Sequence, residues 1–145
     1  MTENYRLSFD RAEMQIDAIH AFLVQSYWAE HIPLEIVERA VAGSLCVGTF
    51  GPGGEQVGFA RVVTDRATFA YLADVYVLGS HRGHGLAARM VTALHDHADL
   101  QGLRRWMLAT SDAHGLYAAL GWTAVEDSEP FMQRHFPDVY RRPRQ

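Results

Sequence analysis

One short segment of the chain combines a strand pattern, two glycines and an arginine in an order suited to holding a phosphate. Residues 74–90 read as a strand rich in β-branched and aromatic residues, then a tight turn, then a helix. A glycine-rich turn at a helix start aims free backbone N–H groups at one point, where the positive end of the helix dipole also lies. Gly83 and Gly85 can adopt positive φ, and Arg82 adds a forked cationic donor. The segment therefore predicts a site for a phosphate-bearing cofactor.

Two common phosphate-binding loops fit this segment poorly. A Walker A loop requires Gly-Lys followed by Ser or Thr, but after Gly85 the chain reads Leu-Ala. A dinucleotide fingerprint requires a third glycine, where this chain has Ala88, and an acidic residue at the end of a second strand. Asp96 and Asp99 are available, but both are expected on or beside the helix. The segment therefore favours another kind of phosphate site.

Two motifs in the chain resemble those of a known family. The pattern Arg82-x-x-Gly85-x-Ala87 behind a valine-rich strand resembles motif A of the GCN5-related N-acetyltransferases (GNAT), which bind acetyl-CoA. Residues 110–122 resemble motif B of the same family, in which a short helix carries Leu-Tyr-x-x-Leu-Gly followed by Phe or Trp. The order and spacing of the motifs match the family, and the resemblance covers roughly residues 45–122 well and both ends loosely.

The resemblance implies how coenzyme A is held. The turn and the start of the helix would take the pyrophosphate on backbone N–H groups. The backbone of the preceding strand would pair with the pantetheine arm, which requires the strands to splay apart after residues 77 and 105, and one N–H there would hold the thioester oxygen. The cofactor-binding residues predicted in this way are Val75, Tyr76, Val77, Arg82, Gly83, His84, Gly85, Leu86, Ala87, Thr110, Ala113 and His114. Two of them have alternatives: Tyr76 could line an acceptor pocket or pack in the core, and His114 could be a surface histidine.

Tyr117 is the candidate catalytic residue. It matches the motif B tyrosine, and a phenol is protonated at neutral pH, so it could act as a general acid toward the leaving thiolate. The alternative is a core aromatic on an amphipathic helix. No general base can be assigned, because polyamine acetyltransferases of this family carry Leu-Glu-Asp before motif A, whereas this chain has Ala73 in the place of the glutamate. Only Asp74 matches, and it could hold a cationic acceptor or cap the strand end.

A loop between the first two helices carries candidate acceptor-binding residues. Tyr27 and Trp28, with Glu30 nearby, could take an ammonium group by cation–π and charge contacts, or could simply attach the loop to the core. His95 and His97 lie two apart on a helix, so their side chains point in different directions and no metal site is predicted.

Composition limits the other classes of function. The 145 residues are 48% hydrophobic, which suits one globular domain spanning residues 1–145, and the net charge of −4 argues against nucleic-acid binding. The single Cys46 excludes an internal disulfide and reads as a small buried side chain. No apolar run is long enough for a membrane span and the first residues lack a leader pattern, so we expect a cytoplasmic protein with no membrane association.

The remaining pattern predicts an α/β (α+β) fold of GNAT type: a mixed, mostly antiparallel sheet of six to seven strands flanked by about four helices. Strand and helix alternation through residues 68–109 predicts a right-handed parallel crossover. Strands are expected at 5–9, 45–50, 56–64, 68–78, 106–109, 122–125 and 131–134, and helices at 11–25, from Pro33 to Gly43, at 85–100 and at 113–120.

The sequence thus predicts an acetyl-CoA-dependent N-acetyltransferase that transfers the acetyl group directly to a primary amine of a small molecule. Two alternatives stay open: a protein or peptide N-acetyltransferase, and a catalytically weak acyl-CoA-binding regulatory domain. The pattern is also compatible with a homodimer.

Overall fold

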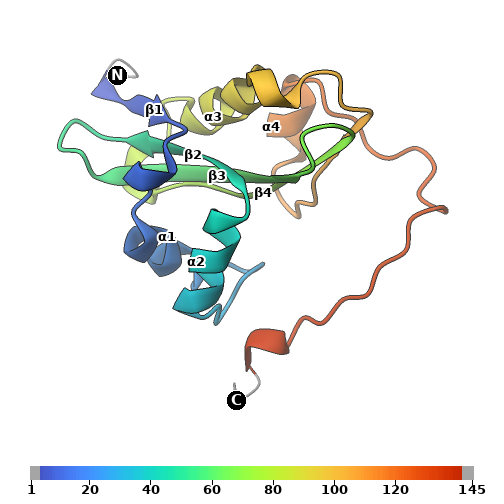
Figure 1. The fold of residues 1–145 in the computed structure, drawn as a ribbon, viewed down its shortest axis with the longest axis horizontal. Helices are drawn as coiled ribbons and strands as arrows, with labels where there is room; N and C mark the ends of the chain where they lie inside the picture. The colour runs from blue at the N-terminus through green and yellow to red at the C-terminus, as the bar shows by residue number, and fades with distance from the viewer. Residues whose placement is uncertain (1–3, 142–145) are drawn as a thin grey trace.

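Five strands form one mixed sheet in the computed structural model, which describes residues 4–141 (Figure 1). They are β1 (Arg6–Ser8), β2 (Leu45–Phe50), β3 (Gln56–Thr64), β4 (Phe69–Val77) and β5 (Arg105–Met107). The strands lie in chain order. The first four pair antiparallel, and β5 pairs parallel to β4 through the expected crossover.

The helices cover both faces of the sheet (Figure 1). α1 (Ile16–Leu23) and α2 (Leu34–Ala42) lie on one face, and α3 (Leu86–His95) and α4 (His114–Ala119) lie on the other. Successive strand residues point to opposite faces. Val62 and Leu72 therefore join the core under α3, while Phe59 and Tyr76 join the core under α1 and α2.

The prediction of six to seven strands is wrong, because neither residues 122–125 nor residues 131–134 form a strand. Trp122 instead packs into an aromatic cluster, where its indole Nε1 donates to Nε2 of His95 at 3.1 Å and its ring lies 6.1 Å from that of Trp106. Residues 131–134 lie in an extended segment, residues 123–141, that we call the C-terminal arm and that leaves the sheet (Figure 1). A strand pattern needs a neighbouring strand to pair with, and the arm has none within the described chain.

Two predicted helices are shorter than expected. The helix predicted over residues 11–25 is broken: a single 3₁₀ turn (Arg11–Glu13), with Asp10 as its cap, precedes α1. Gln15 and Gln56 cause the break, because each backbone N–H donates to the other's side-chain oxygen, at 2.8 and 3.1 Å. The helix predicted over residues 85–100 ends at His95, and a 3₁₀ turn (Ala98–Leu100) follows it.

A bulge in β4 shapes the edge of the sheet where the two motifs meet. Tyr76 pairs with Phe59, but Ala73 pairs with Arg61, so β4 carries one extra residue at this point. Asp74 accommodates it with a left-handed φ of 56°. The pairing of β4 with β5 ends at Tyr71 and Met107, so the rest of β4 has no partner on that side among the described residues.

Within residues 4–141, none of the helices combines the length and the apolar character of a membrane crossing.

Candidate active site

A groove of about 390 Å³ lies where the free part of β4, the start of α3 and α4 come together. It gathers most of the residues that the two motifs predicted. The predicted residues that line it are Val75, Tyr76, Val77, Arg82, Gly83, Gly85, Leu86, Ala87, Ala113, Tyr117 and Trp28. The groove therefore joins motif A and motif B, although residues 82–87 and 110–122 are separate segments of the chain.

Three predicted cofactor-binding residues are not among those lining the groove. The ring of His84 lies 5.6 Å from that of Tyr5. Thr110 caps the segment before α4, where its hydroxyl oxygen accepts from the backbone N–H of Ala113 at 3.1 Å. His114 opens α4 as its first residue. Their proposed contacts with a cofactor stay predictions.

The start of α3 is an open set of backbone donors, which we call the cofactor cradle (residues 82–87). Gly85 is the N-cap of α3 with a φ of 70°, and as a glycine it has no side chain to cap the first turn. Gly83 also has a positive φ, of 89°, and a Cβ at either glycine would meet no atom within 4 Å. Arg82 ties the turn to the strand, since its Nε donates to the carbonyl of Val77 at 3.1 Å. Free N–H groups, open space and a positive dipole end together suit an anion.

The free part of β4 presents backbone donors to the same groove. The N–H of Leu78 donates to the carbonyl of Val57 in β3 at 2.8 Å. Successive N–H groups of a strand point in opposite directions, so the N–H of Val77 points away from β3, toward the side from which β5 has separated. The separation that the family resemblance required is present, and it begins at Tyr71 and Met107.

Tyr117 lies on α4 with its side chain mostly buried and with its ring 6.0 Å from that of Trp122. Burial raises the pKa of its phenol, and the nearby Tyr27 and Asp112 raise it further. Among the described residues its hydroxyl has no hydrogen-bond partner, although the residue lines the groove. The Tyr117 hydroxyl is therefore protonated at neutral pH, and its proton is not used in a hydrogen bond within the described chain.

Tyr76 forms the wall of the groove on the α1 side. Its ring stacks on that of Phe22 with centroids 4.0 Å apart and planes 7° apart. Its hydroxyl is buried without a partner in the described chain, and burial raises its pKa. The side chain thus packs in the core and also faces the groove, which combines both alternatives that the sequence left open.

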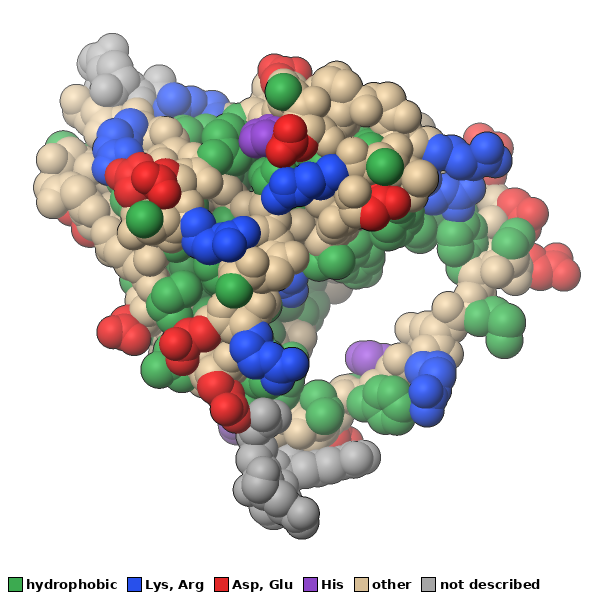
Figure 2. All heavy atoms as spheres, viewed as in Figure 1, with side chains coloured by type: hydrophobic (Ala, Val, Ile, Leu, Met, Phe, Trp, Pro, Cys, Tyr) green, Lys and Arg blue, Asp and Glu red, His purple; other side chains and the backbone are tan. Residues whose placement is uncertain are grey.

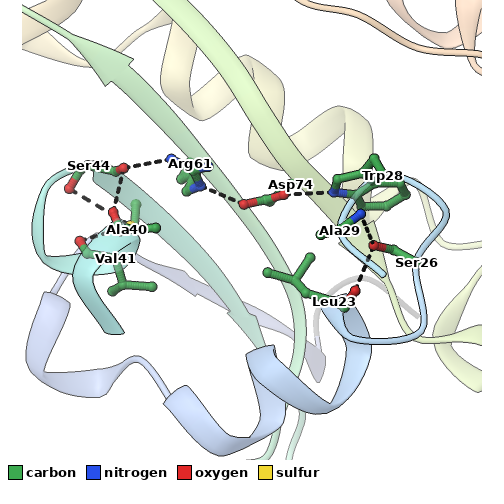
Figure 3. A network of polar contacts seen from close by, with 10 residues as sticks. Leu23, Ser26, Trp28, Ala29, Ala40, Val41, Ser44, Arg61 and Asp74 are labelled. Carbon is green, nitrogen blue, oxygen red and sulfur yellow. Dashed lines mark hydrogen bonds and ion pairs between the residues drawn. The ribbon is translucent and has the colours of Figure 1, made fainter. Parts of the chain in front are cut away.

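Both oxygens of Asp74 have partners inside the protein (Figure 3). Trp28 Nε1 donates to Oδ1 at 2.7 Å, and Arg61 Nε donates to Oδ2 at 2.5 Å. Arg61 also donates from Nη1 to the hydroxyl of Ser44 at 3.1 Å, and that hydroxyl donates to the carbonyl of Ala40 at 2.6 Å. The Arg61 and Asp74 side chains are only 19% and 9% exposed. We call Trp28, Ser44, Arg61 and Asp74 the Asp74 network. A direct ionic contact between Asp74 and an acceptor would have to displace the hydrogen bond from Trp28 or the one from Arg61.

The loop between α1 and α2 is attached at several points beside the groove. Ser26 caps the end of α1, since its hydroxyl donates to the carbonyl of Leu23 and accepts from the N–H of Ala29 (Figure 3). The hydroxyl oxygen of Tyr27 accepts from the backbone N–H of Ser111 at 3.2 Å, which joins this loop to the segment before α4. The hydrogen bonds from Ser111 lower the pKa of Tyr27, because they stabilise the phenolate.

Several residues of this site were not found from sequence. Phe22, His81, Asp112 and Leu116 line the groove, and Arg61 holds Asp74. Phe22 reads as an ordinary helical core position, and Asp112 and Leu116 lie inside motif B without an assigned role. His81 is held by the hydroxyl of Tyr5, at 2.8 Å from its Nδ1, a contact across 76 residues of chain that no local pattern indicates.

Comparison with known proteins gives a consistent result. Residues 11–122 match the model of the Acetyltransferase (GNAT) family. A curated protein of Gibberella zeae, named Putative acetyltransferase FG08082, is 37% identical over 136 residues, which cover 79% of this chain and 76% of that protein. A crystal structure of a Xanthomonas campestris pv. campestris protein assigned to the GNAT family is 50% identical, with a TM-score of 0.91, and the match covers 94% of this chain and 96% of that one. A Deinococcus radiodurans R1 structure described as an acetyltransferase has a TM-score of 0.73 at 18% identity, with 92% and 91% of the two chains covered, and shows a shared fold.

Proposed function

Because this chain belongs to the GNAT acetyltransferase family, we propose that it transfers an acetyl group from acetyl-CoA directly to a primary amine of a small molecule. One observation carries the proposal: a single groove holds the anion-suited start of α3, the unpaired backbone of β4 and the free phenol of Tyr117. Those are the parts needed to hold a pyrophosphate, polarise a carbonyl and donate a proton.

The groove fits the cofactor in its chemistry. When bound, acetyl-CoA supplies the activated acetyl group as a thioester. The cofactor cradle would bind the pyrophosphate through backbone N–H groups and the guanidinium of Arg82. The N–H of Val77 would donate to the thioester oxygen, and the Tyr117 hydroxyl would donate its proton at the sulfur. Because the pKa of Tyr117 is raised, this proton is in place at neutral pH.

The acceptor side of the groove is partly aromatic, which supports an amine as the acceptor. Phe22, Tyr76 and Trp28 form one wall, and Asp112 adds a carboxylate. Ala73 offers no base, and both oxygens of Asp74 have partners. Neither residue therefore serves as the base, and in this proposal the amine reaches the acetyl group after losing its proton to solvent.

A screen of amines tests this function. Acetyl-CoA is mixed with a panel of small primary amines and with amine-bearing peptides, and the release of free CoA is followed. We expect turnover with at least one small amine. CoA binding without turnover on any amine would instead support a binding module, and turnover on peptides alone would support a protein-modifying enzyme.

A charge reversal tests the cofactor site separately. Arg82→Glu places a carboxylate beside the pyrophosphate, so we expect CoA affinity in titration calorimetry to fall at least tenfold. Arg104→Glu makes the same charge change at an exposed turn before β5 and serves as the control. Equal affinities for the Arg82 variant and the parent protein would remove Arg82 from the proposed site.

A further inference from the structure

The C-terminal arm holds its backbone away from the body of the protein. In residues 123–138 of the described chain, only Phe131 donates its N–H to a backbone carbonyl, that of Ser128. Figure 2 shows an open space between the arm and the underside of the sheet. Both ends of the arm are attached: Trp122 lies in its aromatic cluster, and Arg141 pairs with Glu30 at 3.4 Å. The arm therefore bridges α4 and the loop before α2, and between these ends the ring of Phe131 lies 4.9 Å from the guanidinium of Arg105 at the start of β5.

The arm carries apolar side chains that its own chain leaves in solvent. Met132 is 96% exposed and Phe136 is 51% exposed, and Phe131 is also exposed. Figure 2 shows such side chains along the arm and facing the open space. A folded chain does not normally leave a run of large apolar side chains uncovered, and such a run marks a binding surface.

One end of the sheet has a matching uncovered surface. Val63, Phe69 and Tyr71 are all exposed, and we call them the sheet-end patch. Their neighbours Val62, Ala70 and Leu72 are buried under α3, so the patch residues point to the opposite face. Farther along that face α1 and α2 cover Phe59 and Tyr76, but the helices do not cover this end.

We propose that the C-terminal arm of a second copy of this chain fills the open space and packs on the sheet-end patch, and that the two copies do this reciprocally. Each copy has one arm and one patch, so a two-fold dimer satisfies both surfaces at once. Charges favour this contact: residues 123–138 of the arm carry four carboxylates (Glu126, Asp127, Glu129 and Asp138) against one arginine (Arg134). The exposed Arg104 and Arg105 lie beside Phe69, because Arg105 opens β5 and pairs with Phe69 of β4.

The mass of the full chain in solution tests this assembly. By light scattering at micromolar concentration we expect twice the chain mass of 16.3 kDa. Met132→Glu and Phe136→Glu should each shift the protein toward the single-chain mass, because each places a carboxylate in an apolar contact. Phe9→Glu, at an aromatic residue near β1 that is 38% exposed and belongs to neither the arm nor the patch, should leave the dimer intact. A single-chain mass for the parent protein, or a dimer that the two arm variants do not weaken, would overturn the proposal.

A covalent test does not depend on how well the glutamate variants fold. A chain with Tyr71→Cys is co-expressed with a differently tagged chain carrying Met132→Cys, and a short bismaleimide is added. We expect a cross-linked product containing both tags. The native Cys46 is buried, and burial raises its pKa to about 11, so it should not react. Replacing Tyr71→Cys by Phe9→Cys gives the control; equal cross-linking from both positions would contradict the proposed contact.

Discussion

The cofactor cradle and the Asp74 network flank residues 75–81, which lead from β4 to the turn before α3, but the two are built differently. The cradle is backbone from one continuous segment, and its shape depends on glycine conformation at two positions. The Asp74 network is made of side chains from separate elements: Trp28 and Asp74 are 46 residues apart, and Arg61 and Asp74 are 13 apart. This difference predicts that variants of the network change stability and the acceptor side, whereas variants of the cradle change cofactor affinity.

The largest effect on stability is expected from breaking the buried ion pair. Asp74→Ala leaves Arg61 buried without its partner, which we expect to lower the free energy of unfolding by about 3 kcal/mol. Urea unfolding measures this change. Asp99→Ala removes an exposed pair with Arg66, at 3.3 Å, and should cost within about 0.5 kcal/mol. Similar losses for the two variants would show that the Asp74 network is not a structural clamp.

The next largest effect is on the chemical step. Tyr117→Phe removes the proposed acid, so we expect kcat to fall about 100-fold with CoA affinity little changed. Tyr71→Phe, which removes a hydroxyl outside the groove, should leave kcat unchanged. Unchanged kcat in the Tyr117 variant would exclude it as the acid.

The raised pKa of Tyr117 also predicts how kcat depends on pH. The acid form of Tyr117 is the active one, and it is lost only as pH rises through a pKa that burial has raised. The alkaline fall in kcat should therefore lie above the ordinary tyrosine value of about 10, and Tyr117→Phe should lack that fall.

The cradle is expected to respond to backbone strain. Gly85→Val forces a β-branched residue into a left-handed conformation, which costs roughly 1–2 kcal/mol and shifts the start of α3. We expect CoA affinity to fall about tenfold in titration calorimetry. Gly102→Val introduces the same strain at a φ of 75°, on a turn outside the groove, and should reduce stability without changing CoA affinity. If both variants weaken CoA binding equally, the effect is global and the cradle is not its source.

The same contrast explains what could be predicted from the sequence. The cradle and motif B are local patterns in the chain, so the residues of both could be predicted. The crossover between β4 and β5 and the place of most residues from Val75 to Ala87 at the groove could be predicted from the same patterns. The Asp74 network depends on where Arg61 and Trp28 meet in space, and no local pattern encodes that.

The wrong predictions have the same origin. The break before α1 arises from the contact of Gln15 with Gln56, 41 residues away. Residues 122–125 and 131–134 have strand-like composition, but the described chain provides no strand beside them. A site that depends on residues close together in the chain can be predicted from the sequence, whereas an element that depends on a distant neighbour cannot.

The smallest expected effect tests whether the two regions act separately. Trp28→Phe keeps an aromatic ring near Phe22 and Tyr27 but removes the N–H that donates to Asp74. The loss of one partly exposed hydrogen bond should cost about 1 kcal/mol of stability. We expect the loop to be held less firmly, so the KM for the amine should rise several-fold while kcat and CoA affinity stay near those of the parent. If the KM for the amine and the affinity for CoA weakened together, the network and the cradle would be one coupled unit.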